Sequence, residues 1–178
     1  MTRLHLAGAA CAALAVAALG ACNPTTSGAP AKPAVDTSKI ADAVKADADQ
    51  LAADYSAHDV TKVMSHGASD MVAMGHGQPN DVGAAAREAN LKKAFAAVPD
   101  AHVTLANETT DVAASGDMAV FHSTYVFTGT DPKTKKAVTE NGNYLAGYKP
   151  QADGSWKQMW SVVSDTGPAP KAAPAAKS

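Results

Sequence analysis

Three turn signals divide the C-terminal half of the chain into segments of strand length. The signals are Ser115-Gly116, Asp131-Pro132 and Asp153-Gly154, residue pairs that favour reversal of the backbone. The segments are rich in β-branched and aromatic residues and cover residues 101–112, 117–129, 135–149 and 155–164. Because the links between the last three segments are short, they predict an antiparallel meander.

The part of the chain before the meander favours helices. A first helix of about 17 residues is predicted by apolar residues spaced three and four apart, namely Ile40, Val44, Ala48, Leu51 and Tyr55. Its N-cap is expected at Asp36, Thr37 or Ser38. A second, short helix is expected after the N-cap residue Asp59 and ends at His66-Gly67.

A third helix is expected from about Ala84 to Val98, where Pro99 stops it. Residues 70–74 favour a short strand, and the turn residues of 75–80 favour a hairpin tip. The order is therefore helix, helix, short hairpin, helix and four strands. Helices packed against one antiparallel sheet give an α+β fold.

The first 21 residues are expected to be a targeting signal. Arg3 and His5 precede an apolar stretch of about 14 residues, 6–19, which is too short to span a bilayer as a helix. The stretch ends in LGAC, residues 19–22, which resembles a bacterial lipobox. That resemblance implies cleavage before Cys22, a diacylglycerol on its thiol, and a place on the periplasmic side of the outer membrane where the host has one. The alternative is an ordinary secretory signal, which the same small residues also permit.

Low-complexity segments flank the predicted domain. Residues 22–37, rich in Pro, Ser, Thr, Gly and Ala, favour a flexible tether, and residues 168–178 favour a disordered tail. One domain, residues 38–167, remains. The two cysteines of the chain are Cys11, inside the signal, and Cys22. The domain therefore has no internal disulfide and depends on its apolar core.

The charge balance argues against nucleic acid as a partner. The formal net charge is −2, and loss of residues 1–21 removes one arginine, leaving 14 basic against 17 acidic residues and a net charge of −3. A nucleic-acid-binding domain usually carries a basic patch, which this composition does not supply. No second apolar run is long enough to cross a bilayer, so contact with the membrane is expected through the N-terminal lipid alone.

Two stretches resemble the nuclear transport factor 2-like superfamily. Residues 55–74, YSAHDVTKVMSHGASDMVAM, resemble the start of that domain, with matches at Asp59 and Asp70. Residues 143–164, NYLAGYKPQADGSWKQMWSVVS, resemble its closing strands, with matches at Tyr144, Leu145, Asp153, Gly154, Trp156 and Lys157. The chain is most similar to the domains related to ketosteroid isomerase and the SnoaL-like polyketide cyclases. The resemblance implies three N-terminal helices and a curved antiparallel sheet around a cone-shaped pocket, often in a homodimer.

The resemblance also implies where a ligand would bind. In the family, the first helix and the central strands line the pocket, and here they offer Tyr55, Met74, His122, Tyr144 and Trp160. Both faces of the strand over 117–129 are largely apolar. We expect the face with His122 to line the pocket, although a hydrogen-bonded structural role for His122 is the alternative. The opposite face, with Phe121, Tyr125 and Phe127, is expected to form a dimer surface.

The sequence favours binding over catalysis. The family's catalytic Tyr–Asp–Asp set does not map onto this chain, because Tyr55 falls near the end of the first helix and no Asp interrupts residues 118–127 or 144–148. No nucleophile elbow, phosphate loop or zincin motif occurs. We expect a non-catalytic domain that binds a small, partly apolar ligand or acts as an accessory protein, without a cofactor. The alternatives are an isomerase-like, cyclase-like or hydrolytic enzyme that uses a pocket acid with His122 or a tyrosine, and a homodimeric interaction module without a ligand.

A soft-metal site is a further alternative. MSHG at 64–67 returns as MGHG at 74–77, so Met64, His66, Met74 and His76 offer sulfur and imidazole ligands. We expect no metal, because the two repeats fall on different structures, a helix end and a turn. On this interpretation His66 and His76 are exposed turn residues, and their replacement by alanine leaves the stability nearly unchanged.

Overall fold

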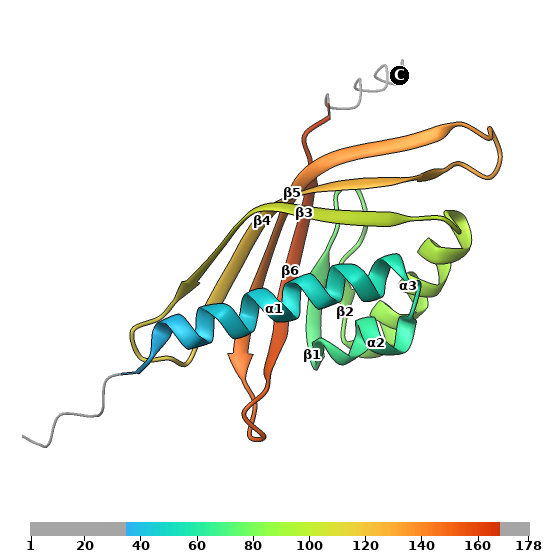
Figure 1. Cartoon of the computed structure of the whole chain (residues 1–178). Helices are drawn as coiled ribbons and strands as arrows, with labels where there is room; N and C mark the ends of the chain where they lie inside the picture. Colours follow the sequence, from blue (N-terminus) through green and yellow to red (C-terminus); the bar gives the residue numbers. More distant parts are fainter. Residues whose placement is uncertain (1–34, 168–178) are drawn as a thin grey trace, which may run out of the picture. The chain divides into compact units, whose positions relative to one another are not determined.

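The computed structural model describes residues 35–167. The predicted signal, Cys22, most of the predicted tether and the predicted tail lie outside the described residues. Figure 1 shows helices packed on one side of a single sheet. In chain order the elements are α1 (Thr37–Ser56), α2 (Val60–Ser65), β1 (Gly67–Met74), β2 (Asp81–Val82), α3 (Ala84–Ala97), β3 (His102–Val112), β4 (Ala119–Thr130), β5 (Ala137–Pro150) and β6 (Trp156–Asp165). The sequence predicted this order of helices and strands.

The first two helices each begin at an aspartate. The carboxylate of Asp36 accepts the backbone N–H of Lys39 at 3.3 Å, and that of Asp59 accepts the backbone N–H of Lys62 at 3.0 Å. These bonds satisfy amides that have no partner in the first turn of a helix. Helix α3 instead follows Gly83, whose φ of +81° lies in the left-handed region that glycine tolerates best. Within residues 35–167, no helix is long and apolar enough to cross a membrane.

The sheet is curved and mixed, with strand order β2-β1-β6-β5-β4-β3 (Figure 1). Strands β3 to β6 form the predicted meander, and each pair of neighbours in it is antiparallel. Strand β1, however, pairs with β6 in parallel, with Met74 opposite Val162. The prediction of an antiparallel sheet was therefore wrong for this pair. Turn signals report on strands that follow each other in the chain, so they could not indicate the direction of a pairing between the first strand and the last.

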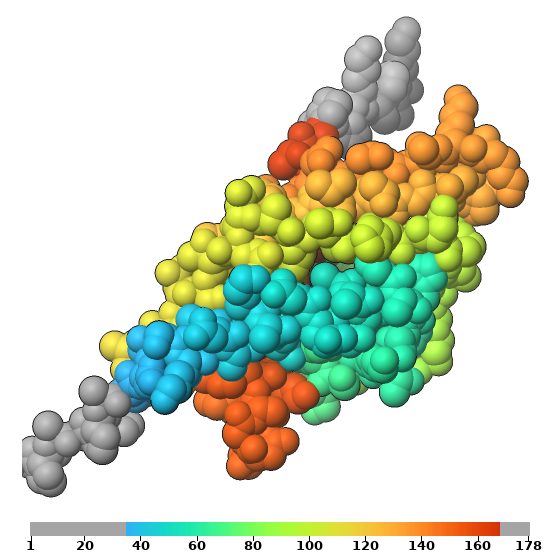
Figure 2. Space-filling model, in the orientation of Figure 1, coloured from blue at the N-terminus to red at the C-terminus, as the bar shows by residue number. Residues whose placement is uncertain are grey.

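The helices cover the inner face of the sheet. Helix α1 runs across it, and in Figure 2 the atoms of α1 lie over the strands behind them. The main core cluster joins α1 to β4 and β5 and comprises Val44, Ala48, Ala119, Phe121, Ala146 and Tyr148. A second cluster joins α2 to α3 and comprises Val63, Leu91 and Phe95. Full burial of each large apolar side chain contributes about 1.5–3 kcal/mol to stability, so these clusters fix the helices on the sheet.

Candidate ligand-binding site

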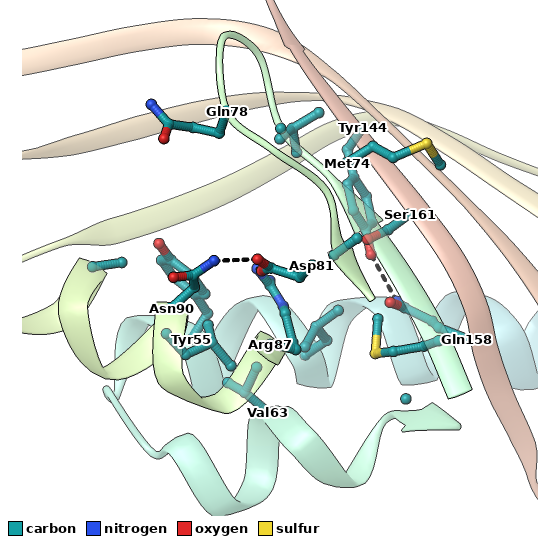
Figure 3. Close-up of a pocket in the computed structure, with 18 of the residues that line it drawn as sticks. Tyr55, Val63, Met74, Gln78, Asp81, Arg87, Asn90, Tyr144, Gln158 and Ser161 are labelled. Atoms are coloured by element: carbon teal, nitrogen blue, oxygen red, sulfur yellow. Dashed lines mark hydrogen bonds and ion pairs between the residues drawn. The ribbon is translucent and has the colours of Figure 1, made fainter. Parts of the chain in front are cut away.

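A cavity of about 1020 Å³ lies between the helices and the inner face of the sheet (Figure 3). Its wall includes Leu51 of α1, Met71 of β1, Leu91 of α3, Leu105 of β3 and Phe127 of β4. Small-molecule sites are typically cavities of roughly 300–1,000 Å³ with a mainly apolar wall and a few polar groups. The cavity therefore has the size and wall chemistry of such a site.

Strand β2 and helix α3 place a buried carboxylate in this wall. Asp81 begins β2 and is 7% exposed. Arg87 and Asn90 lie three residues apart on α3, so they share one face of that helix. The Oδ2 atom of Asp81 accepts a hydrogen bond from Nη1 of Arg87 at 3.4 Å, and its Oδ1 atom accepts one from the side-chain amide of Asn90 (Figure 3). Each carboxylate oxygen of Asp81 thus already accepts one hydrogen bond.

Strands β4 and β5 supply a second polar pair. The hydroxyl of Tyr125 donates a hydrogen bond to the carboxylate of Glu140. Gly142 lies opposite Tyr125 in the sheet, and a Cβ atom there would lie 2.5 Å from the Tyr125 ring. A residue without a side chain at 142 therefore leaves room for the ring. Burial, and then the hydrogen bond to Glu140, raise the pKa of Tyr125, so its hydroxyl stays protonated.

Tyr55 contributes a hydroxyl from the last turn of α1. Its ring packs edge-on against Phe95 of α3, with ring centroids 4.9 Å apart. Burial raises the pKa of Tyr55, while the charge of Arg87 acts in the opposite direction. Among the described residues, the hydroxyl of Tyr55 has no hydrogen-bond partner, although the residue lines the cavity.

A third polar group forms part of the wall on β5 and β6. The side-chain amide of Gln158 donates to the hydroxyl of Tyr144 at 2.7 Å and to that of Tyr148 at 2.8 Å. Gln158 is 3% exposed, so both hydrogen bonds are shielded from water. Burial raises the pKa of both tyrosines. Gln158 and Tyr144, which line the cavity, therefore present neutral, fixed groups to a ligand.

His66 lies behind this wall and is bonded to two carboxylates. Its Nδ1 atom is 2.8 Å from Asp47 and its Nε2 atom 3.0 Å from Asp54. Ionised carboxylates only accept hydrogen bonds, so both ring nitrogens donate and the ring is an imidazolium. Burial lowers the pKa of His66, but the bonds to Asp47 and Asp54 outweigh that effect and raise it overall. The backbone carbonyl of His66 also accepts the backbone N–H of Gln158 at 2.9 Å, which links this cluster to the cavity wall.

This arrangement corrects the prediction that His66 is an exposed turn residue. His66 is 7% exposed, because the end of α2 packs it beneath α1 where Asp47 and Asp54 face it. Neither ring nitrogen is free to bind a metal. His76 does lie in an exposed turn, 3.5 Å from Asp165. Within residues 35–167, no three His, Cys, Asp or Glu residues are grouped so that they could hold a metal ion.

Three of the five residues predicted to line the pocket do line the cavity: Tyr55, Met74 and Tyr144. His122 does not, since it lies on the outer face of β4, where it approaches Asp111 of β3 at 3.5 Å. The predicted assignment of the two β4 faces was therefore reversed. Phe121 is fully buried beneath α1, and Tyr125 and Phe127 line the cavity. The larger aromatic side chains occupy the covered face because burying them removes more apolar area from water.

Trp160 is the second residue that the structure places elsewhere. Gly147 pairs with Trp160 and Tyr148 pairs with Gln158, so a bulge at Met159 shifts the alternation of β6 by one residue. Gln158 and Ser161 consequently face the cavity, whereas Trp160 packs over Gly147 on the outer face. Strict alternation from Gln158 would have turned Trp160 inward. The sequence gives no direct sign of this bulge.

The sequence interpretation missed the polar residues of the cavity. Arg87 and Asn90 could have been found, because they share the helix face of Leu91, a predicted apolar position. Asp81 could have been considered with them, because it lies three residues before the predicted helix. Gln158 could also have been found, because strict alternation places it on the same face as Trp160, which was predicted to face the pocket.

Comparison with known proteins confirms the resemblance to the SnoaL-like domains. The model of the SnoaL-like domain family matches residues 48–159, well over half of the chain. No curated protein matches the chain in sequence.

Solved structures share the fold. A ketosteroid isomerase-like protein from Erwinia carotovora atroseptica SCRI1043 is 23% identical, with a TM-score of 0.64 over 73% of this chain and 98% of that one. A nuclear transport factor 2-like superfamily protein from Salmonella enterica serovar Typhimurium LT2 is 12% identical, with a TM-score of 0.68 over 76% and 97%. A nuclear transport factor 2-like protein of unknown function from Pseudomonas putida KT2440 is 19% identical, with a TM-score of 0.62 over 71% and 87%. At these identities the likeness shows the fold, and the family match shows the membership: the chain belongs to the SnoaL-like domain family, with a nuclear transport factor 2-like fold.

Proposed function

We propose that this domain binds a small, partly apolar molecule in the cavity between the helices and the sheet. The observation that carries the proposal is the cavity itself, about 1020 Å³ in volume, with an apolar wall and three separate polar groups. An apolar ligand gains free energy from leaving water, and a few fixed polar groups orient it. The pocket that the family resemblance implies corresponds, on this proposal, to the same cavity.

Binding without catalysis is the role that the polar groups favour. A general base needs a carboxylate that is free to accept a proton from the substrate. Both oxygens of Asp81 accept hydrogen bonds from α3, and Glu140 accepts one from Tyr125. His122, the histidine of the enzymatic alternative, lies on the outer face of the sheet. Among the described residues, Asp81 and Glu140 are thus held by neighbouring side chains, which favours binding over proton transfer.

We further propose that a lipid on Cys22 holds the domain in the cell envelope. The support is the sequence LGAC at residues 19–22 after an apolar stretch of signal length. Replacement of Cys22 by serine should move the protein from the membrane to the soluble envelope fraction, because the lipid supplies the membrane affinity. A serine variant that remains on membranes after a salt wash would contradict the proposed lipid anchor but not the proposed ligand binding.

Self-association through the outer face of the sheet is a second proposal. Val126 and Leu145 lie on that face and are 38% and 37% exposed, and Trp160 packs over Gly147 on the same side. Apolar side chains gathered on a face that no helix covers are typical of protein interfaces. A homodimer would bury them and leave the cavity on the opposite face free for its ligand.

Native mass spectrometry tests the ligand and the dimer together. The domain is purified from its host without denaturation, and its mass is compared with the mass after unfolding. We expect a small molecule that is lost on unfolding, on a dimer. If the intact mass equals the mass of the bare chain in preparations from several growth conditions, the binding proposal loses its support, whereas a loaded monomer contradicts the dimer alone.

A further inference from the structure

We propose that the cavity selects an organic anion, a molecule with an apolar body and one carboxylate or similarly acidic group that binds Arg87 and the hydroxyl of Tyr55. This inference rests on the proposed ligand-binding function and specifies the chemical class of the ligand. It follows from an imbalance between the hydrogen-bond donors and acceptors of the cavity.

Arg87 is the main donor. A guanidinium has five N–H groups, and in the described residues Arg87 makes one hydrogen bond, to Asp81 at 3.4 Å. That distance is longer than the usual 2.7–3.2 Å, so the pairing is weak. Asn90 holds the other oxygen of Asp81, which fixes the carboxylate beside Arg87 without using the remaining guanidinium donors. Figure 3 shows Arg87 on the same side of the cavity as Tyr55, Asp81 and Asn90.

Tyr55 is the second donor. Its ring is held against Phe95, and its hydroxyl has no partner among the described residues. The positive charge of Arg87 acts on Tyr55 and also on Tyr144, so the guanidinium lies within electrostatic reach of both rings. An acidic group placed beside Arg87 could therefore accept from the guanidinium and from the Tyr55 hydroxyl.

The carboxylates of the cavity wall already accept hydrogen bonds from neighbouring side chains. Asp81 accepts from Arg87 and Asn90, Glu140 accepts from Tyr125, and the hydroxyl of Tyr144 accepts from Gln158. A ligand rich in donors would meet carboxylates that neighbouring side chains already engage, whereas a ligand with an acceptor would meet the unused donors of Arg87 and Tyr55. Hydrogen bonds between a guanidinium and an anion are about twice as strong as neutral ones, so an acidic acceptor gains most.

Asp81 and Glu140 are the two negative charges of the wall that oppose an anion, and Arg87 already pairs with Asp81 at 3.4 Å. Glu140 is exposed, so water and salt screen its charge, whereas the side chain of Arg87 is only 28% exposed. Lys93, which also lines the cavity, offsets Glu140 in the total charge of the wall. The anionic end of the ligand is therefore expected at α3, with the apolar body along Leu51, Met71 and Leu91.

A matched pair of fluorescent probes tests this inference. The anion 1-anilinonaphthalene-8-sulfonate and the neutral N-phenyl-1-naphthylamine share one aromatic body, and both become bright in an apolar site. We expect the wild type to bind the anion at least about tenfold more tightly than the neutral probe, since hydrogen bonds between charged partners are stronger than neutral ones. Arg87→Gln should remove this preference, and Tyr55→Phe should reduce it without leaving any group unpaired.

Lys92→Gln is the control. Lys92 lies on the same helix, pairs with Glu88 at the surface and is not among the residues that line the cavity, so its loss changes the net charge equally. The anion preference should survive in this variant. Equal binding of the two probes by the wild type, or an unchanged preference in folded Arg87→Gln and Tyr55→Phe proteins, overturns the anion inference and leaves the binding function standing. Failure of the wild type to bind either probe contradicts the binding function itself and the inference with it.

Discussion

The Nε2 atom of His66 lies 3.0 Å from the carboxylate of Asp54 on α1, and both side chains are buried. Asp47 holds the other ring nitrogen at 2.8 Å, and Gln50 donates a further hydrogen bond to Asp54 at 2.9 Å. The cluster therefore ties α1 to the junction between α2 and β1. Since the carbonyl of His66 binds the backbone of Gln158, it also supports the wall of the cavity.

Removal of the imidazole should destabilise the domain. His66→Ala leaves two carboxylates facing each other without a cation, and breaking a buried ion pair in this way costs about 3–5 kcal/mol. His76→Ala is the control, because His76 lies in an exposed turn and its replacement should cost no more than about 0.5 kcal/mol. Urea unfolding of both variants measures the difference. Equal stabilities would show that the cluster contributes nothing.

Stability should depend on pH through the same residues. The pKa of His66 is raised above its ordinary 6.5, so its contribution is complete below that pH and is lost as pH rises through the raised folded-state value. Burial works to raise the pKa of Asp54, but hydrogen bonds from His66 and Gln50 lower it overall, so its contribution is present above 3.8 and is lost as pH falls through the lowered value. The free-energy difference between the wild type and His66→Gln should therefore be largest near pH 5 to 6 and should shrink toward pH 9. A difference that stays constant over this range is the contrary result.

The bulge in β6 places Trp160 over Gly147 on the outer face, so adding a methyl group at residue 147 should lower the stability of the domain. A Cβ atom at Gly147 would lie 2.2 Å from Cε2 of Trp160, so Gly147→Ala must displace the indole. Overpacking of this kind costs about 1–3 kcal/mol. Gly75→Ala is the matched control, because the nearest atom to a Cβ there is 3.9 Å away. Melting temperatures compare the two, and a Gly147→Ala protein as stable as Gly75→Ala would mean that Trp160 is not held over Gly147.

The proposed homodimer is tested by a charge on the outer face. Leu145→Lys should convert a dimer to a monomer in sedimentation experiments, since a lysine in an apolar interface loses its hydration without a partner. Val82→Lys is the control, because Val82 is 68% exposed on the short edge strand β2. Neither variant should change binding in the cavity. A dimer that survives Leu145→Lys places the interface elsewhere.

Local patterns allowed most of the fold to be predicted. Asp36 and Asp59 begin the first two helices as N-caps, and Pro99 follows the third. The three turn signals fall between the strands of the meander. Each of these signals acts within a few residues, where sequence and structure are directly linked.

The candidate site was less predictable because it depends on contacts between distant residues. Both faces of β4 are apolar, so the sequence could not determine which one α1 covers, and His122 was placed on the wrong face. In the sequence, His66 looks like a turn histidine. Its bonding partners Asp47 and Asp54 precede it by 19 and 12 residues, so no local pattern indicates these contacts. The direction of Trp160 depends on a bulge that has no local signal.

Titration of cavity-filling variants with the neutral probe N-phenyl-1-naphthylamine tests the central claim most directly. Ser161 of β6 faces the cavity and is 7% exposed, whereas its neighbour Val162 is not among the residues that line the cavity. Both Ser161→Phe and Val162→Phe enlarge a side chain of the same strand, and their melting curves show whether each is folded. Binding of a small apolar molecule in the cavity predicts that the folded Ser161→Phe protein loses probe affinity at least about tenfold while Val162→Phe keeps the wild-type value. Equal affinity of wild type, Ser161→Phe and Val162→Phe, or no binding by the wild type, would contradict the claim.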